Sequence, residues 1–396
     1  MTAGTPFHPR TSALNRTLAW GDWSGYHAAA VYADHHDIEY AAIRNAAALI
    51  DVSPLRKYTV TGPDACRLVD RVITRDASRM EVGQVLYTPW CEERGKVLDD
   101  GTVARTGHSS YRWTAALPCY RWIRMNASGL DVEVTDDSDS TAALALQGPM
   151  SRALLERVCG AGVSELGYFR RAGFEIAEVP VDVSRTGYTG DLGYELWIPA
   201  GGALSVWDAL TDAGGDFGLR PVGIRAMDVA RLEAGLLLVE VDYSGADQAL
   251  TASHEYSPFE LGLGPLVDLR KPAFAGRRAL VAERERGGPP RRLVGLVLDW
   301  GDLERTFARA DLPPAIAATV VREQTPLRSG SAQIGRATST SWSPTLKSVI
   351  ALGLVRAGHA QPGTTLTYEL TVDGERADVR ASVVPLPFLD LPRKRA

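Results

Sequence analysis

The middle of the chain reads Ser184-Arg185-Thr186-Gly187-Tyr188-Thr189-Gly190-Asp191-Leu192-Gly193-Tyr194-Glu195-Leu196-Trp197. Three glycines separate two tyrosines and a glutamate, and the stretch ends in a pattern typical of a β-strand. Because successive side chains of a strand point to opposite faces, Glu195 lies on the face opposite Tyr194 and Leu196. If that face is interior, Glu195 is a buried carboxylate that needs hydrogen-bond donors. The alternation alone favours the other interpretation, an exposed hairpin strand.

The composition around this stretch is that of an ordinary folded protein. The chain has 396 residues, 45% of them hydrophobic and 23% charged, which is too long for one simple core. Its formal net charge of −5 argues against a nucleic-acid-binding surface, which needs a basic excess. No apolar run approaches the roughly 20 residues that span a bilayer, the N-terminus lacks a secretory pattern, and the 4 cysteines lie far apart. We therefore expect a soluble, multidomain, cytoplasmic protein without nucleic-acid or membrane partners.

One structural unit is predicted twice. Residues 57–63 and 143–149 each read as a strand that ends in a Gly-Pro turn, and a short amphipathic helix follows each, over residues 64–73 and 151–158. Ser151 is the expected N-cap of the second helix. Further strands are expected at residues 85–90 and 112–117, and further helices at residues 203–213 and 226–235. These patterns indicate mixed α/β units.

A charged, turn-rich segment at residues 283–292 has no apolar face and is interpreted as a solvated linker. A series of short strand-like segments follows it, at residues 293–298, 332–336, 348–355, 364–372 and 381–384. Such a series is typical of a small β-barrel or sandwich. The terminal Arg393-Lys394-Arg395 is expected to be a frayed, solvated tail.

The common catalytic and metal-binding motifs are absent. The sequence contains no GxGxxG, P-loop, HExxH or GxSxG pattern. His35 and His36 are adjacent, so on one helix they would point in different directions and could not share a metal ion. We therefore predict no metal site, and the scattered histidines argue equally against a serine or cysteine triad.

Two carboxylates stand side by side in the run Gly95-Lys96-Val97-Leu98-Asp99-Asp100-Gly101-Thr102-Val103. At a junction of strand and turn their side chains project to opposite faces, so at most one of them faces a pocket. Composition alone favours a solvated β-turn, in which aspartate is common because it bonds to the backbone.

Several motifs together resemble those of the glycine-cleavage T-protein (aminomethyltransferase) family. The central stretch at residues 184–196 is one of them. The others are Leu49-Ile50-Asp51-Val52-Ser53, Gln147-Gly148-Pro149, Arg220-Pro221-Val222-Gly223, Arg231-Leu232-Glu233-Ala234, Phe274-Ala275-Gly276-Arg277-Arg278-Ala279-Leu280 and Thr338-Ser339-Thr340-Ser341-Trp342-Ser343-Pro344-Thr345-Leu346. Each motif alone is weak, but their occurrence in family order from about residue 38 to residue 388 indicates homology.

This resemblance implies an α+β fold, in which three domains form a cloverleaf-like arrangement around a central tetrahydrofolate pocket. It implies a folate-binding region at residues 1–290, with two α/β subdomains of roughly 1–140 and 141–282 that can interleave, and a C-terminal β-barrel at residues 291–396. It also implies an enzyme that moves one-carbon units to or from tetrahydrofolate.

The resemblance also assigns roles to single residues. By position, Asp100 matches the family's catalytic aspartate, and Glu195 matches the glutamate that holds the pterin through its amino group and ring N–H. Tyr87, Tyr188 and Trp342 match positions around the folate, where aromatic rings can stack on it. Asp100 could accept a proton or stabilise cationic charge, and a partly dry pocket raises the pKa of such a carboxyl group.

The chain departs from the T-protein pattern on the side of the one-carbon donor. Met227 stands where that pattern has an arginine, and Arg225 lies two positions earlier. An apolar group thus replaces a cation, so we expect a different donor. This version resembles the folate domains of dimethylglycine and sarcosine dehydrogenases and of folate-dependent demethylases. We assign Arg225 to the folate, and Met227, Trp20 and Tyr243 to the donor substrate.

The aromatic N-terminal segment, with Trp20, Trp23, Tyr26 and Tyr32, could cover the donor pocket. The alternative is that these rings are part of the core, because tryptophan and tyrosine bury large areas in any case.

The leading hypothesis is a tetrahydrofolate-dependent methyltransferase, whose donor is a small methylated amine, sulfonium or aryl ether. A true aminomethyltransferase of glycine cleavage would instead need lipoylated H-protein, a less favoured partner because of Met227 and the altered residues 238–256. The third alternative is a non-catalytic folate-binding protein, like the iron–sulfur-assembly relatives of the family. Those relatives carry a functional cysteine where residues 236–243 of this chain have none.

Overall fold

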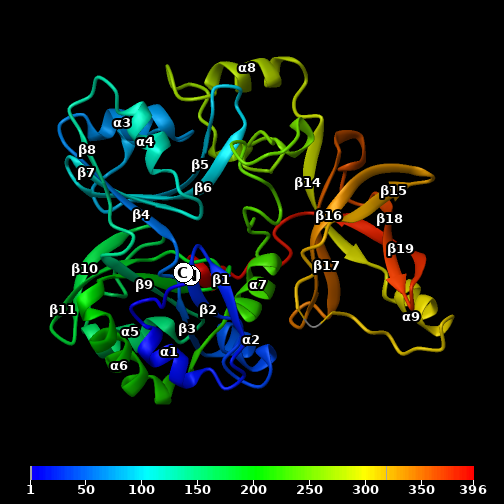
Figure 1. Cartoon of the computed structure of the whole chain (residues 1–396), viewed down its shortest axis with the longest axis horizontal. Helices are drawn as coiled ribbons and strands as arrows, with labels where there is room; N and C mark the ends of the chain where they lie inside the picture. The colour runs from blue at the N-terminus through cyan, green and yellow to red at the C-terminus, as the bar shows by residue number, and fades with distance from the viewer. Residues whose placement is uncertain (1, 318) are drawn as a thin grey trace.

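The computed structural model describes residues 2–317 and 319–396 of the chain. Figure 1 shows three lobes: two sheet-and-helix lobes on the left and a barrel on the right, with helix α7 (Ile224–Glu233) between them. The sheets have six and five strands, and the barrel is closed. The α+β class and the C-terminal barrel predicted from the sequence are therefore confirmed.

The six-stranded sheet of the lower lobe has the strand order β10-β11-β12-β9-β3-β13. Its strands are β3 (Ala47–Asp51), β9 (Thr141–Gln147), β10 (Arg171–Ile176), β11 (Val179–Ser184), β12 (Gly193–Pro199) and β13 (Leu219–Pro221). The helices α5 (Ser151–Cys159) and α6 (Ala203–Gly214) pack on one face, where Leu146, Tyr194 and Leu196 are buried with Trp207. The opposite face turns toward the middle of the molecule.

The five-stranded sheet of the upper lobe has the order β5-β6-β7-β4-β8. Its strands are β4 (Arg56–Thr61), β5 (Val85–Cys91), β6 (Val97–Gly107), β7 (Ser110–Ala115) and β8 (Glu133–Asp136). The helices α3 (Ala65–Val72) and α4 (Tyr120–Asn126) cover one face, over a core that contains the edge-on pair Trp90 and Trp113. All five strands lie between β3 and β9 in the sequence, so the two sheets are interleaved along the chain.

The barrel closes in the order β14-β17-β16-β15-β18-β19, with β19 pairing back to β14. Its strands are β14 (Arg291–Leu298), β15 (Thr325–Ser329), β16 (Ala332–Ser343), β17 (Ser348–Arg356), β18 (Thr365–Val372) and β19 (Glu375–Val384), and α9 (Trp300–Ala308) packs on β19. The sequence did not predict β15 or α9. The predicted linker at 283–292 is shorter than expected, because α8 (Arg277–Glu285) extends into it and β14 begins within it.

The two ends of the chain both return to the lower lobe. The N-terminal part forms α1 (His8–Leu14), the hairpin β1 (Trp20–Trp23) and β2 (Tyr26–Ala29), and α2 (His36–Asn45), which packs against α7. After the barrel, Arg393 donates to both carboxylate oxygens of Asp191, at 2.7 and 2.8 Å, and to the carbonyl oxygen of Arg44. The expectation of a frayed tail is therefore wrong, because this arginine meets a buried carboxylate.

Two local expectations also differ from the structure. Met150, not Ser151, is the N-cap of α5, and no side chain caps this helix. The acidic stretch around Asp99 and Asp100 lies in strand β6 rather than in a solvated turn, because the turn ends before Val97. None of the helices within residues 2–317 and 319–396 has the length and apolar character needed to cross a bilayer.

Candidate active site

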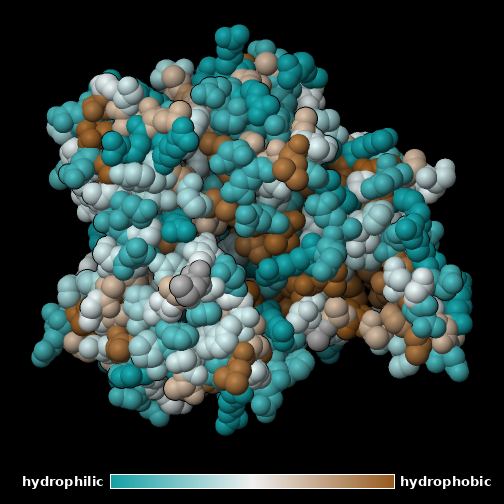
Figure 2. Space-filling model, in the orientation of Figure 1, coloured by the Kyte–Doolittle hydropathy of each residue, from teal (hydrophilic) through white to brown (hydrophobic). Residues whose placement is uncertain are grey.

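An apolar cluster lies where the three lobes meet, and it is the setting of the site. It combines residues from every lobe, such as Val97, Met227, Tyr243 and Ile350, and Tyr87, Tyr188 and Trp23 pack against it as half-buried rings. Figure 2 shows apolar surface gathered at this central junction, between lobes whose outer surfaces are mostly hydrophilic. A polar group that enters this cluster is therefore largely withdrawn from water.

Asp99 and Asp100 point to opposite faces of β6, as the alternation of a strand requires. Asp99 is only 1% exposed, and its Oδ2 accepts the backbone N–H groups of Ala116 and Leu117 at 3.0 and 2.8 Å. Asp99 thus holds the loop that follows β7. Asp100 faces the central cluster, so it is the carboxylate available to a ligand.

Two phenols hold the carboxylate of Asp100. Tyr87 lies on β5, where Pro89 pairs with Asp100, so Tyr87 is its diagonal neighbour on the same face. The Tyr87 hydroxyl donates to Oδ2 at 2.7 Å, and the Tyr243 hydroxyl donates to Oδ1. Burial raises the pKa of Asp100 above its ordinary value, and the hydrogen bonds from Tyr243 and Tyr87 oppose that rise. Burial also raises the pKa of both phenols, which keeps them protonated as donors.

The segment after Tyr243 is attached to the strand that carries Asp100. The Ala246 N–H donates to the Val97 carbonyl at 2.9 Å, and the Val97 N–H donates to the Tyr256 carbonyl at 2.8 Å. A Cβ at Gly245 would lie 2.6 Å from the Leu98 carbonyl oxygen, so only glycine permits this approach. The inserted residues thus fix the position of Tyr243 against β6.

A buried ion-pair network holds Asp242, the residue directly before Tyr243. Arg231 on α7 is fully buried and pairs with Asp228 at 2.7 Å and with Asp242 at 2.5 Å. Asp242 also accepts the hydroxyls of Thr338 and Ser339 from β16, each at 2.6 Å. The neighbour of Tyr243 is therefore bonded to both α7 and the barrel.

Glu195 lies on β12, on the inner face of the lower sheet. It shares that face with Trp197, while Tyr194 and Leu196 point to the helices. The Arg112 guanidinium lies over the Trp197 ring, 4.5 Å from the ring centroid. Thr186 donates its hydroxyl to Oε2 of Glu195. Burial raises the pKa of Glu195, and the Thr186 hydrogen bond and the charge of Arg112 oppose this rise. The strand is therefore not the exposed hairpin strand that the alternation alone favours. Glu195 lies on the face that turns toward the middle of the molecule.

Tyr188 connects the surroundings of Glu195 and Asp100. It is half-buried, its hydroxyl donates to the Leu237 carbonyl, and it follows Thr186 by two residues. Burial raises the pKa of Tyr188, the cation of Arg231 opposes that rise and the charge of Asp100 adds to it. Tyr188 is thus close to both the ion-pair network and the Asp100 carboxylate.

Of the other residues predicted for the site, three are not part of the central cluster. Trp342 lines a separate cavity beside α2, the side chain of Arg225 is exposed at the start of α7, and Trp20 packs against His8 and His27. Of the N-terminal aromatic residues, Trp23 packs against the central cluster. Met227 is 8% exposed within that cluster.

Sequence reasoning missed several supporting residues. Thr186 and Arg231 lie inside the quoted motifs, so an inspection of the polar residues in those motifs could have found them. Arg112 and Asp242 carry no local signal, because they matter through partners on other segments. The expectation that His35 and His36 point in different directions on one helix is also wrong. His35 precedes α2 as its N-cap, so the two side chains do not follow helical spacing.

Comparisons with known proteins identify the family and agree with the fold. The family model of the GCVT N-terminal domain matches residues 11–271, and that of the glycine cleavage T-protein C-terminal barrel domain matches residues 291–390. The solved aminomethyltransferase T of the glycine cleavage system from Bartonella henselae superposes with a TM-score of 0.83 and 25% identity, over 98% of this chain and 99% of that chain.

Two curated relatives differ in length. The chain is 38% identical to the aminomethyltransferase of Moorella thermoacetica, over 90% of each protein. It is 36% identical to the trimethylamine-oxide aldolase of Ruegeria pomeroyi, over 100% of this chain but 48% of the relative. The chain thus spans about half the length of this second relative and most of the first.

Proposed function

This chain belongs to the glycine cleavage T-protein family, and on that premise we propose that it moves a one-carbon unit from a small methylated donor to tetrahydrofolate. Aminomethyltransferases of the family use tetrahydrofolate as a substrate, so the chain is a folate-dependent one-carbon transfer enzyme. The observation that carries the proposal is the Asp100 carboxylate, held by two phenols inside an apolar cluster.

Glu195 has the free acceptor that a pterin needs. Among the described residues only Thr186 donates a hydrogen bond to its carboxylate, and it does so to Oε2. Oε1 therefore has no donor among the described residues, and Oε2 keeps a further lone pair, so the carboxylate can accept the amino group and the adjacent ring N–H of a pterin as a pair, one on each oxygen. The charge of Arg112 favours the ionised form of Glu195, the form that accepts both bonds. In this proposal Tyr87 and Tyr188 flank the bound folate.

Asp100 is proposed as the proton acceptor. When N5 of tetrahydrofolate forms a bond to the one-carbon unit, the bond from that carbon to its leaving group breaks and N5 holds a surplus proton. A carboxylate whose pKa is raised above its ordinary value by burial is a better proton acceptor than an exposed one. The hydrogen bonds from Tyr87 and Tyr243 leave Asp100 one fixed orientation in which to do so.

Met227 favours a methylated donor. It is a buried apolar side chain at the position where the T-protein pattern has an arginine, so a donor there meets no cation from this residue. Methyl groups bind well against a polarizable thioether. The name of one relative, trimethylamine-oxide aldolase, likewise indicates a methylated amine N-oxide as its substrate.

Aminomethyl transfer is the second candidate. It is favoured by the match to aminomethyltransferases over 90% of both chains, and it would require a lipoylated H-protein as partner. The two candidates share the folate site and differ in the donor and in the products released.

The deciding experiment incubates the full chain with tetrahydrofolate and one donor at a time, and identifies the folate product by mass spectrometry. A sulfonium or aryl methyl ether should give 5-methyl-tetrahydrofolate and the demethylated leaving group. Trimethylamine N-oxide should give 5,10-methylene-tetrahydrofolate, dimethylamine and water. Product formation only with aminomethylated H-protein, accompanied by ammonia release, would establish the second candidate. No product with any donor, from a folded protein, would contradict both.

A further inference from the structure

A cluster of three metal-binding side chains lies outside the site described above. His35, His36 and Asp37 each offer one ligand atom, and these atoms all lie within 4.8 Å of one another. We propose that this cluster binds one divalent transition-metal ion of the zinc type. The proposal does not depend on the folate site or on the identity of the donor.

The local backbone explains why two adjacent histidines can converge. His35 is the N-cap of α2 and is extended, with φ −143° and ψ 141°, whereas His36 is the first helical residue. The change of conformation between them removes the rotation that would separate neighbouring side chains on a helix. Their ring centroids are consequently 4.7 Å apart, with 32° between the ring planes.

The distances within the cluster are close to those of a coordination sphere. Nδ1 of His35 lies 3.0 Å from Oδ2 of Asp37, and Nε2 of His36 lies 3.5 Å from Oδ1. Ligand atoms about 2 Å from a tetrahedral zinc ion stand roughly 3.3 Å from one another. To hold an ion through one oxygen, the Asp37 carboxylate would turn, and Nδ1 of His35 would give up the 3.4 Å hydrogen bond that it accepts from the Asp37 backbone N–H.

The chemistry of the donors selects the class of ion. Imidazole nitrogen suits zinc, copper and nickel, whereas calcium and magnesium prefer sites made only of oxygen. The carboxylate of Asp37 offsets part of the charge of a divalent cation. We therefore infer a site for a late first-row cation, and zinc is the probe of choice.

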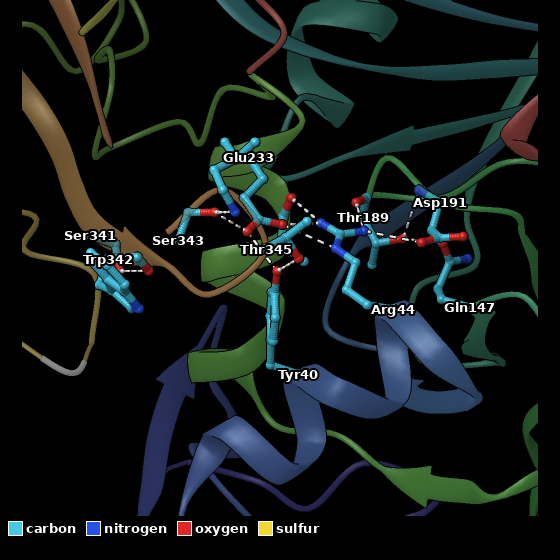
Figure 3. A network of polar contacts seen from close by, with 12 residues as sticks. Tyr40, Arg44, Gln147, Thr189, Asp191, Glu233, Ser341, Trp342, Ser343 and Thr345 are labelled. Carbon is cyan, nitrogen blue, oxygen red and sulfur yellow. Dashed lines mark hydrogen bonds and ion pairs between the residues drawn. The ribbon is translucent and has the colours of Figure 1, made fainter. Parts of the chain in front are cut away.

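The cluster also borders a cavity that leaves room for the ion and a further ligand. The cavity has a volume of about 220 Å³, and its wall includes the three donors together with Tyr40, Val229 and Trp342. Figure 3 shows Tyr40 projecting from α2 and Trp342 from the barrel. No lysine or arginine is among the described residues of this wall. Three protein ligands would leave a zinc ion an open coordination position, which a water molecule could take.

Two of the three donor side chains are accessible to solvent, and the third is buried. The side chains of His35 and Asp37 are 51% and 61% exposed, so an ion can reach them from solvent, while that of His36 is 6% exposed and fixed by its surroundings. Tyr40, on the cavity wall, donates its hydroxyl to Glu233 at 2.6 Å and so belongs to the network that joins α2 to α7. All three donors belong to residues 35–37, so an ion bound here would stabilise the start of α2, in proportion to its preference for the folded over the unfolded chain.

The test is a calorimetric titration of the tag-free chain with zinc chloride, in the absence of folate and donors. We expect one zinc ion per chain for the wild type and for His108→Ala, a control that removes an exposed histidine from a distant loop. His35→Ala and Asp37→Asn should each weaken binding at least tenfold. Both residues are exposed, so these variants should fold even if His36→Ala does not. Zinc should also raise the Tm of the wild type but not that of His35→Ala.

Cobalt provides a second readout of the same site. Cobalt(II) bound by nitrogen and oxygen donors absorbs visible light according to its geometry, so the wild type should show absorption bands that His35→Ala lacks. No saturable binding by the wild type, or equal zinc affinity in the wild type and His35→Ala, would overturn the proposal. Neither result would affect the folate assignment, because neither titration contains a folate.

Discussion

The hydroxyl of Tyr243 donates a hydrogen bond to Oδ1 of Asp100, from a residue 143 positions further along the chain. Tyr87 donates to Oδ2 of the same carboxylate, so the two oxygens are held by different segments of the chain. The first segment is the neighbouring strand β5, and the second is fixed through Asp242 to α7 and the barrel. The upper lobe, α7 and the barrel therefore all contribute to the orientation of one carboxylate.

Replacing Asp100 by asparagine should abolish most turnover and leave folate binding intact. The amide keeps the shape of the side chain but cannot accept a proton, and loss of a general base typically costs about 10²- to 10⁴-fold in rate. We expect a fall of at least 100-fold in kcat, measured by folate product formation. Glu93→Gln, which neutralises an exposed carboxylate before the same strand, is the control and should keep full activity. Unchanged turnover in Asp100→Asn would remove Asp100 from the mechanism.

The pH dependence of Tyr243→Phe tests the hydrogen bond itself. The Tyr243 hydroxyl stabilises the charged form of Asp100 and so lowers its pKa, and its removal must raise that pKa further. Because Asp100 is proposed to act as the ionised carboxylate, the acidic limb of kcat/KM should move to higher pH, by about one unit for one charge-assisted hydrogen bond. Tyr168→Phe, which alters an exposed ring, should leave the profile unchanged. A limb that stays in place or moves to lower pH would refute this role for Tyr243.

Glu195→Gln should affect folate binding more than chemistry. A glutamine in this position has one carbonyl acceptor and an amide donor that opposes the N–H groups of a pterin. Loss of a charge-assisted hydrogen bond costs about 1.5–3 kcal/mol, so KM for tetrahydrofolate should rise roughly 10- to 100-fold with a smaller change in kcat. Glu175→Gln on β10 of the same sheet is exposed and serves as the control. An unchanged KM in Glu195→Gln would assign the pterin contact to another residue.

Arg231→Met should destabilise the protein. The substitution leaves the buried carboxylates of Asp228 and Asp242 without their shared cation, and loss of one partner from a buried ion pair costs about 3–5 kcal/mol. The free energy of unfolding, measured by urea titration, should fall by about that amount. Arg225→Met, on the exposed side of the same helix, should change it by less than about 0.5 kcal/mol. Equal stability of the two variants would show that the network is not a structural support.

The sequence predicted the elements that depend on local patterns. The helix α3 and the strands β4, β9 and β12 have clear periodicity and glycine turns, and they lie within a few residues of the expected positions. The acidic stretch was harder to interpret, because aspartate is common in turns and only pairing with β5 and β7 makes it a strand.

The site itself depends on contacts between distant segments, which a single sequence does not encode locally. The choice between Asp99 and Asp100 follows from which face of β6 the helices cover, and that is a tertiary fact. The contact of Arg393 with Asp191 and the convergence of His35 with His36 arise in the same way, the first from the path of the tail and the second from the exact start of a helix.

The central claim is that a reduced folate binds against Glu195 with its reactive nitrogen beside Asp100, and calorimetric titration with tetrahydrofolate tests it most directly. We predict saturable binding of one folate per chain in the wild type, similar affinity in Asp100→Asn, and at least tenfold weaker binding in Glu195→Gln. Absence of saturable heat in the folded wild type, or equal affinity in the wild type and Glu195→Gln, would contradict the account.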